Sequence, residues 1–284
     1  MTPFGWEEPE TLKEAVALLD PDDPTVRPIA GGTALMLMMK SGVFTPSRLV
    51  SLEKVEPRYS AIGSDGAGGL RIGAMASLSA LEQSKDVAQL FPAMKKALKT
   101  LSNVRVRNVA RVGGALAHGD PHMDLPPLLA ALGARVSTVG AGESREIAVE
   151  DLYTGYYETV LAKNELIAEV HVPPLNGAHA VYLKCTSRSA DYWPALSVAA
   201  RIEMQGGAIR ALRLVVSAAT EKVTRLSEAE KILTGATPDD KTLRRAADAA
   251  VAEVSFLSDS HGSAAYKREL LRVYLARAIL EAAA

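Results

Sequence analysis

The stretch PIAGGTALMLMMK, residues 28–40, joins a short apolar run to a helical run rich in leucine and methionine. Two glycines and a threonine, Gly31–Thr33, occupy the junction. Glycine has no Cβ, so a ligand can approach the main chain closely at such a point. Consecutive backbone N–H groups at the start of a helix favour bound anions. The stretch therefore has two interpretations, a tight turn or a loop that lies against an anionic ligand.

A second glycine pair repeats this chemistry in RNVARVGGALAHGDPHMDLP, residues 107–126. The run Val109–Val112 is prone to form a strand, and Gly113 and Gly114 follow it together with small residues. Two such junctions suit one extended anion, such as a diphosphate that carries nucleoside ends. Neither loop matches the dinucleotide fingerprint GxGxxG or the phosphate loop GxxxxGK[ST]. We therefore expect neither a Rossmann site nor a P-loop nucleotide site.

Composition excludes several classes of protein. The chain has 284 residues and a net charge of −1, without the basic surface that binding to nucleic acid requires. A single cysteine, Cys185, excludes an internal disulfide framework and a cysteine-ligated cluster held by this chain alone. The first residues lack the pattern of a signal peptide, and no apolar run reaches membrane-spanning length. We expect a cytoplasmic protein without a membrane span.

Hydrophobic periodicity and turn residues predict an α+β protein of two units. We expect strands over 26–30, 48–52, 70–74, 134–139, 145–149, 165–172, 180–185, 196–204 and 209–217. We expect helices after a capping box at Thr11, over 79–83 and 92–101, after an N-cap at Thr237 and Pro238, and over 263–283. Residues 105–124 are predicted to be irregular. The proline- and glycine-containing segment 173–177 is the predicted domain boundary.

At this point the motifs resemble a known family. AGGTALMLMMK (30–40) and RNVARVGGALAHGDPHMDLPPLLAAL (107–132) resemble the FAD-binding medium subunits of molybdenum hydroxylases, the relatives of carbon monoxide dehydrogenase and xanthine dehydrogenase. YLKCTSRSADYWPALSVAA (182–200) and SDSHGSAAYKRELLRVYLARAI (258–279) resemble two further motifs of that family. The opening pattern at 4–19 matches as well, so the resemblance spans nearly the whole chain.

The resemblance implies an α+β fold of two domains. Residues 1–174 would form an FAD-binding domain of the PCMH type, with two α/β subdomains at about 1–55 and 56–174. Residues 175–284 would form a small C-terminal α+β domain with an antiparallel sheet and helices.

The resemblance also implies the residues that bind FAD. The first loop would bind the diphosphate through its backbone amides, at Ala30, Gly31, Gly32, Thr33 and Ala34. The second loop would bind the flavin and ribityl group, at Gly113, Gly114 and Asp124. Lys184 would lie near the flavin, and Tyr192 would lie beside the isoalloxazine. Each of these residues also has a structural interpretation. Asp124 can cap the helix at 125–132, a role compatible with binding the ribityl group. Tyr192 can be a half-buried aromatic residue, and Lys184 the solvated end of a strand.

Three residues depart from the family pattern: Arg111 replaces a usual threonine, Ala115 an asparagine and Trp193 an alanine. Each lost hydrogen bond to the flavin would cost about 0.5–1.5 kcal/mol. An ion pair between Arg111 and a phosphate would offset that loss. His118 and His122 also suggest a metal site together with Asp120 and Asp124, but the loop setting and the family comparison argue against one.

The sequence thus predicts an electron-transfer flavoprotein subunit and no catalytic acid or base. A large partner subunit would hold a molybdenum cofactor and a small partner would hold 2Fe–2S clusters, in a dimer of heterotrimers. FAD would be the one cofactor of this chain. The alternatives are a non-catalytic assembly subunit that has lost flavin binding, and a stand-alone flavin oxidase. About 110 residues follow Pro174 without an obvious substrate pocket motif, which argues against the oxidase.

Overall fold

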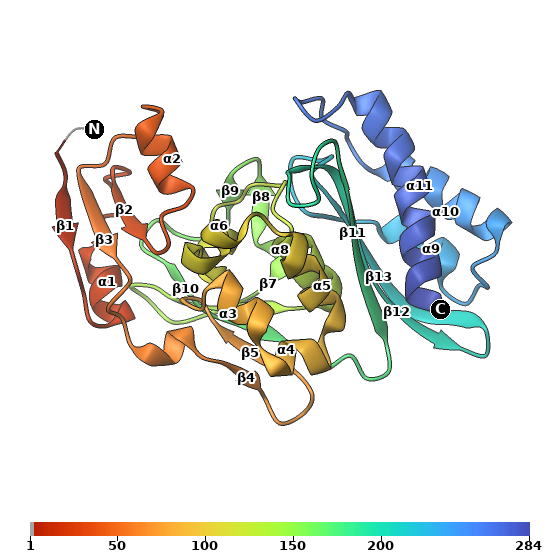
Figure 1. Cartoon of the computed structure of the whole chain (residues 1–284), viewed down its shortest axis with the longest axis horizontal. Coiled ribbons are helices and arrows are strands. Elements are labelled where there is room, and N and C mark those ends of the chain that lie inside the picture. The colour runs from red at the N-terminus through yellow and green to blue at the C-terminus, as the bar shows by residue number, and fades with distance from the viewer. Residues whose placement is uncertain (1–2) are drawn as a thin grey trace.

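The N-terminal sheet is small and parallel. The computed structural model describes residues 3–284 and begins with this sheet, at the left of Figure 1. The strand order is β1–β3–β2, with bounds β1 Gly5–Glu7, β2 Val26–Ile29 and β3 Arg48–Ser51. Helix α1 (Leu12–Leu18) follows the predicted capping box, in which the side chains of Thr11 and Glu14 each accept from the other's backbone N–H. Helix α2 (Leu35–Lys40) directly follows the first glycine loop.

The central sheet is antiparallel, with the strand order β4–β5–β10–β6–β7. Its strands are β4 Ile62–Ser64, β5 Leu70–Gly73, β6 Arg135–Val139, β7 Glu146–Ala148 and β10 Leu166–Val172. The loop at 65–69 joins β4 to β5 as a hairpin. Short elements border the sheet: η1 Pro57–Ser60, η2 Val149–Asp151, β8 Tyr153–Gly155 and β9 Glu158–Thr159.

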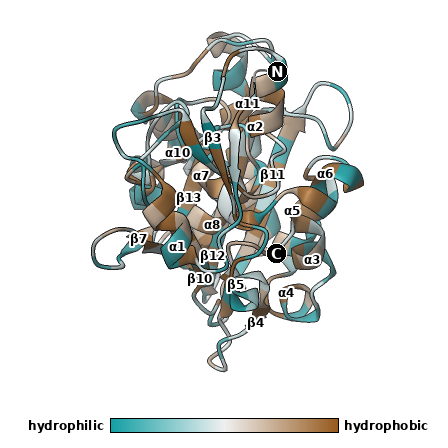
Figure 2. Ribbon diagram, turned by 90° about the vertical axis from the view of Figure 1, so that its left-hand side faces the viewer, coloured by the Kyte–Doolittle hydropathy of each residue, from teal (hydrophilic) through white to brown (hydrophobic). Residues whose placement is uncertain are grey.

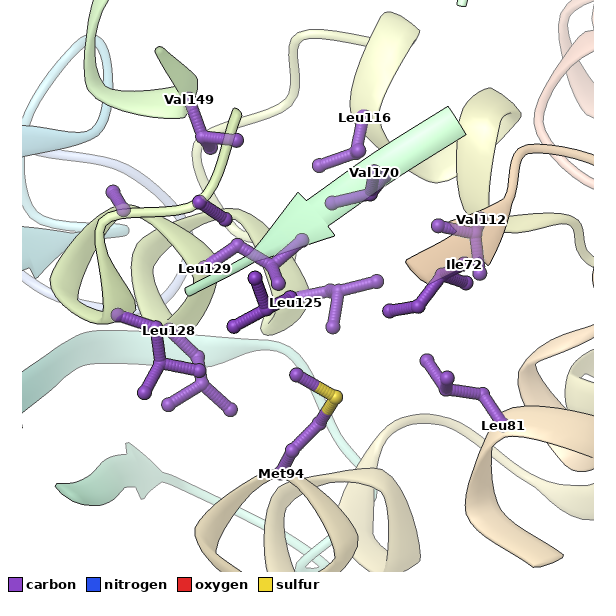
Figure 3. Packing of buried hydrophobic residues seen from close by; sticks show 14 of the residues in the cluster. Ile72, Leu81, Met94, Val112, Leu116, Leu125, Leu128, Leu129, Val149 and Val170 are labelled. Atoms are coloured by element: carbon purple, nitrogen blue, oxygen red, sulfur yellow. The ribbon is translucent and has the colours of Figure 1, made fainter. Parts of the chain in front are cut away.

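Six helices lie between β5 and β6 in the chain and supply most of the central core. Their bounds are α3 Leu78–Gln83, α4 Lys85–Leu90, α5 Pro92–Thr100, α6 Val104–Val109, α7 Val112–Ala117 and α8 Leu125–Leu132. Figure 3 shows how side chains from these helices, such as Leu81, Met94 and Leu128, meet Val170 of β10 and Ile72 of β5. This apolar burial is the main favourable contribution to the folding of the region.

Helix α8 buries all of its residues because it lies between two sheets. It packs against α5 and α7 on one side and against the C-terminal sheet on the other. Gly133 ends the helix with φ 75°, the left-handed conformation that glycine adopts without strain. The central core consequently includes residues of the C-terminal sheet, among them Ala199 and Val215.

The C-terminal sheet is antiparallel, with the order β11–β12–β13–β14. Its strands are β11 His179–Thr186, β12 Pro194–Gln205, β13 Ala208–Ser217 and β14 Thr224–Arg225. The helices on its outer face are α9 Ser227–Leu233, α10 Asp240–Glu253 and α11 Ala264–Ala283. Figure 1 shows the resulting succession of central sheet, helices, C-terminal sheet and outer helices, and Figure 2 shows hydrophilic residues gathered on the peripheral loops.

The N-terminal sheet shares little of this core. Its main cluster, formed around Leu12, Ala15 and Val50, reaches the rest of the molecule through Met75 and the first residues of β10. The largest cluster, in contrast, is continuous from β5 to β13.

The predicted α+β class is confirmed, and the predicted strands appear within one or two residues of their expected ends. Two local predictions were wrong. Residues 105–124 are not irregular, because α6 and α7 occupy much of them, and the strand-prone run Val109–Val112 is the junction of those helices. The N-cap of α10 is Asp239, whose carboxylate accepts from Thr242 N–H at 2.7 Å, and not the expected Thr237.

Truncating Leu128 tests the role of α8. Leu128 is fully buried, so Leu128→Ala should lower the free energy of unfolding by about 2–5 kcal/mol through lost burial and a residual cavity. Urea unfolding followed by circular dichroism measures the change. The control Leu37→Ala removes a side chain that is 67% exposed and should change stability little. Equal effects of the two variants would contradict the packing described here.

Candidate functional site

The first glycine loop, residues 30–34, has four backbone N–H groups without an acceptor. Among residues 3–284, no hydrogen bond is donated by the amides of Gly31, Gly32, Thr33 or Ala34. Gly32 has φ 67°, which turns the chain from β2 into α2, and its carbonyl accepts from Met36 N–H at 2.9 Å. The five residues of the loop are all half-buried. This arrangement is suited to an anion that accepts several hydrogen bonds at once.

Backbone packing brings the first loop against the second. A Cβ added to Gly31 would lie 2.1 Å from the carbonyl oxygen of Val109 and 2.9 Å from Cα of Ala110. Any residue other than glycine would therefore push the two loops apart. Gly31 is required by this close approach, which explains one of the two glycines without a ligand.

The glycines of the second loop differ in their surroundings. Gly113 N–H donates to the carbonyl of Ala74 at 2.8 Å, and its added Cβ would meet the Ala74 side chain at 2.7 Å. Gly114 has nothing within 4 Å of an added Cβ, and its amide donates no hydrogen bond within the described chain. Gly113 is thus explained by packing, whereas Gly114 is open to a ligand.

Arg111 joins the second loop to the N-terminal sheet. Its Nη2 donates to both carboxylate oxygens of Glu53, at 3.1 and 2.9 Å. Its Nε is buried and has no partner within the described residues. The guanidinium thus lies beside the loop junction, but the partner that the structure gives it is a carboxylate.

Asp124, Lys184 and Tyr192 form a second group. Lys184 Nζ lies 3.1 and 3.2 Å from the two carboxylate oxygens of Asp124 and donates to the carbonyls of Thr100 (2.8 Å) and Tyr192 (3.4 Å). Tyr182 Oη donates to Asp124 at 2.5 Å. Burial raises the pKa of Asp124, against the opposing effects of Lys184 and the Tyr182 hydrogen bond.

These contacts bear on the structural alternatives. The Asp124 side chain makes no capping hydrogen bond to α8, so the helix-cap alternative is wrong. The side chain of Lys184 is 7% exposed, so the solvated-strand alternative is also wrong. Tyr192 is half-buried, with Arg188 stacked 4.9 Å from its ring centroid. The first group, which contains the two loops, and this second group adjoin through α7 and α8, which pack on each other.

A third group is centred on His122, which the sequence analysis considered only as part of a metal site with His118, Asp120 and Asp124. His122 Nδ1 lies 2.9 Å from Asp120 and Nε2 lies 3.1 Å from Asp259. Asp259 and its partner Lys267 belong to the C-terminal motif at 258–279, so the motif was visible but its contact across the fold was not. Both imidazole nitrogens are already hydrogen-bonded, which leaves no lone pair for a metal. Between residues 3 and 284 no group of three or more histidine, cysteine, aspartate or glutamate side chains has an arrangement that could hold a metal ion.

A cavity of about 380 Å³ adjoins the second group through Tyr182, which lines it. It is lined by residues of α5, β11 and the end of α11, and the ion pair Lys96–Glu281 lies at its edge. None of the predicted site residues lines it.

The described helices include none that is long and apolar enough to cross a membrane.

Comparison with known proteins identifies the family. Residues 2–175 match the family model described as the FAD binding domain in molybdopterin dehydrogenase, and residues 181–282 match the C-terminal domain of CO dehydrogenase flavoproteins. The chain belongs to this family. It is an oxidoreductase flavoprotein subunit of the molybdenum hydroxylases, and its cofactor is FAD.

Several relatives match the chain over nearly their whole length. The glyceraldehyde dehydrogenase medium chain of Sulfolobus acidocaldarius is 32% identical over 99% of this chain and 98% of its own. The nicotine 6-hydroxylase medium subunit of Paenarthrobacter nicotinovorans is 31% identical over 98% and 97%. The carbon monoxide dehydrogenase structure from Hydrogenophaga pseudoflava superposes with a TM-score of 0.94, at 30% identity over 99% and 98%.

Two glycine substitutions distinguish the closely packed glycine of the first loop from the open glycine of the second. Gly31→Ala should destabilise the flavoprotein chain by about 1–3 kcal/mol, because the new methyl group meets the backbone at Val109. Gly114→Ala, within α7, should instead stabilise it by about 0.5–1 kcal/mol. Urea unfolding of the FAD-free chain measures both. Similar stability changes for the two variants would contradict the geometry of the loops.

Removing the Lys184 ammonium should expose the cost of burying Asp124. Lys184→Met leaves the carboxylate without its cation, so stability at pH 7 should fall by about 3–5 kcal/mol. The pKa of Asp124, already raised, rises further, so protonation favours the folded variant and the deficit should shrink as the pH falls.

Urea unfolding at pH 7 and pH 5 measures this deficit. The control Lys54→Met breaks an exposed pair with Glu8 and should have little effect at either pH. A deficit that is independent of pH would show that Asp124 does not carry an unpaired charge in the variant.

Proposed function

We propose that this flavoprotein subunit transfers electrons, with the FAD diphosphate lying along the first loop and the flavin end against Gly114. The observation that carries the proposal is the set of four unpartnered amides from Gly31 to Ala34. A diphosphate offers oxygen acceptors for such amides without needing a positive side chain. The open surface at Gly114 allows a planar group to approach the backbone of α7.

The remaining site residues fit supporting roles. Arg111 holds the loop junction through Glu53, whose carboxylate balances the charge of the guanidinium. Lys184 and Asp124 fix the position of Tyr192, since Lys184 also donates to the Tyr192 carbonyl. Bound FAD would supply the redox chemistry, taking electrons from a partner and passing them to an external acceptor. The protein supplies position and electrostatics and needs no general acid or base.

The proposed partners are a large subunit with the molybdenum cofactor and a small subunit with 2Fe–2S clusters, assembled as a dimer of heterotrimers. Relatives named for glyceraldehyde, nicotine and carbon monoxide all match this chain over nearly its full length. We infer that substrate choice resides in the large partner subunit.

We also propose that the chain has two domains, residues 1–174 and 175–284, and that the first consists of two subdomains that meet near residue 55.

Flavin content tests the proposal. The purified chain should show a flavin absorption spectrum and release about one FAD per chain on denaturation. Gly114→Val should lower FAD affinity about tenfold or more, because its side chain fills the open surface and 1.4 kcal/mol of lost contact is already a tenfold change. Fluorescence titration with FAD measures the affinity.

The matched control is Gly142→Val, which also meets nothing within 4 Å but lies in an exposed loop at the end of β6. It should leave FAD binding unchanged. A wild-type chain that is colourless and does not take up added FAD would overturn the proposal and support the alternative, a non-catalytic assembly subunit.

A further inference from the structure

Three segments that are distant in sequence meet at the buried ring of His122. The first is its own loop, residues 118–124, which ends the glycine-rich segment. The second is the turn at 258–263 before α11, and the third is the turn between β11 and β12 that carries Trp193. His122 is 7% exposed, whereas Trp193 in the third segment is 42% exposed, so the group extends from the interior to the surface.

Hydrogen bonds tie the first two segments together. His122 bonds Asp120 in its own loop at 2.9 Å and Asp259 before α11 at 3.1 Å. Asp259 also accepts from Lys267 at 2.5 Å, and Lys267, which is fully buried, donates to the Ala218 carbonyl at 3.0 Å. Both ring nitrogens face a carboxylate, and an imidazole donates to two acceptors only when it carries both protons. The geometry therefore selects the imidazolium.

The neighbouring charges also favour the protonated form of His122. The carboxylates of Asp120 and Asp259 raise the pKa of His122 above its ordinary value of 6.5, although burial opposes them. Burial also opposes the shift at Asp259, but Lys267 and the other donors lower the pKa of this carboxyl to about 2. The pKa of His261 is lowered by burial and then by the charge of His122. Among the tyrosines, Tyr157 donates to Asp120 at 2.8 Å, and the nearby Tyr156 ring packs on that of Tyr157 at 4.8 Å.

Aromatic contacts bring in the third segment. The ring of Trp193 meets that of His122 edge-on at 5.9 Å, and the ring of His261 lies 5.2 Å from His122. Tyr192 in turn packs edge-on against His261 at 5.7 Å. Two adjacent aromatic residues of one turn are thus held by two histidines of this group.

We propose that His122 is a positioning residue: as an imidazolium bonded to Asp120 and Asp259 it fixes the second glycine-rich loop to the turn before α11. Its ring and that of His261, in this turn, hold Trp193 and Tyr192 of the third segment through aromatic contacts. When FAD is bound, this arrangement fixes the distance between the second glycine-rich loop and the turn with Tyr192, the two segments proposed to lie against the flavin. The last statement rests on the proposed function, whereas the contact itself does not. Nothing in this role requires His122 to touch the flavin.

Tryptophan fluorescence tests the contact in the absence of cofactor. The chain has two tryptophans, so Trp6→Phe leaves Trp193 as the single reporter. A protonated imidazole quenches an adjacent indole, so emission from Trp193 should rise as the pH increases, with a midpoint above 6.5. His122→Gln in this background should abolish the step. The contact is present at lower pH and lost as the pH rises through the raised pKa of His122.

Two further variants keep the test decisive. His261→Gln removes the neighbouring histidine, whose pKa is lowered, and should leave the step above 6.5 in place. Asp259→Asn removes one carboxylate and should move the midpoint downward, which provides a test if His122→Gln does not fold. The proposal would be overturned if Asp259→Asn left the midpoint of the fluorescence titration unchanged, or if the fluorescence step were still present in His122→Gln.

FAD titration tests the consequence for the flavin site. His122→Gln removes the charge-assisted bond from the second glycine-rich loop to Asp259, so its FAD affinity should be about tenfold lower than that of the wild-type chain at pH 7. The difference should be smaller at pH 9, where the wild-type contact is also weakened. Equal FAD affinity of the two proteins at pH 7 would overturn the positioning role. A wild-type chain that binds no FAD would instead contradict the proposed function, and the Trp193 titration would still decide the contact.

Discussion

The buried pair of Lys184 with Asp124 is the interaction on which the middle of the molecule depends. Removing two charges from water is costly, and the pair is tolerable because further polar groups complete its hydrogen bonding. Those groups are the Tyr182 hydroxyl and the carbonyls of Thr100 and Tyr192. Together with the pair, these groups come from the start of α8, the end of α5, strand β11 and the turn after it. One ion pair thereby joins the helical layer to the C-terminal sheet.

Local patterns were sufficient for most of the fold. The strands alternate or run apolar between clear turn residues, so β5, β6 and β10–β13 could be predicted from periodicity. The strand prediction for Val109–Val112 was wrong because it followed the β-branched residues, whereas long-range hydrogen bonds determine the conformation of this run. The amides of Val112 and Gly113 donate to carbonyls of Ala76 and Ala74, which places the start of α7 beside β5. A single sequence does not contain that partner.

The candidate site also has one part that could be predicted from the sequence and one part that could not. The two glycine loops were found because a backbone site leaves a compositional trace in glycine and small residues. The partners of its charged residues left no such trace: Glu53 lies 58 positions from Arg111, and Asp259 lies 137 positions from His122. Asp124 and Lys184 were each singled out for the flavin, but their mutual bond depends on how α8 meets β11. Motifs therefore located the loops, and packing determined what their side chains do.

The uneven sharing of the core has a consequence for local opening. The central and C-terminal sheets contribute to one continuous cluster, so their amides should exchange with solvent hydrogen through the same cooperative unfolding. The N-terminal sheet has strands of three or four residues and a largely separate cluster. Its opening requires much less buried area to be exposed. The loop at 30–34 belongs to this part of the chain, so a nucleotide held there would lower the population of its open state by mass action.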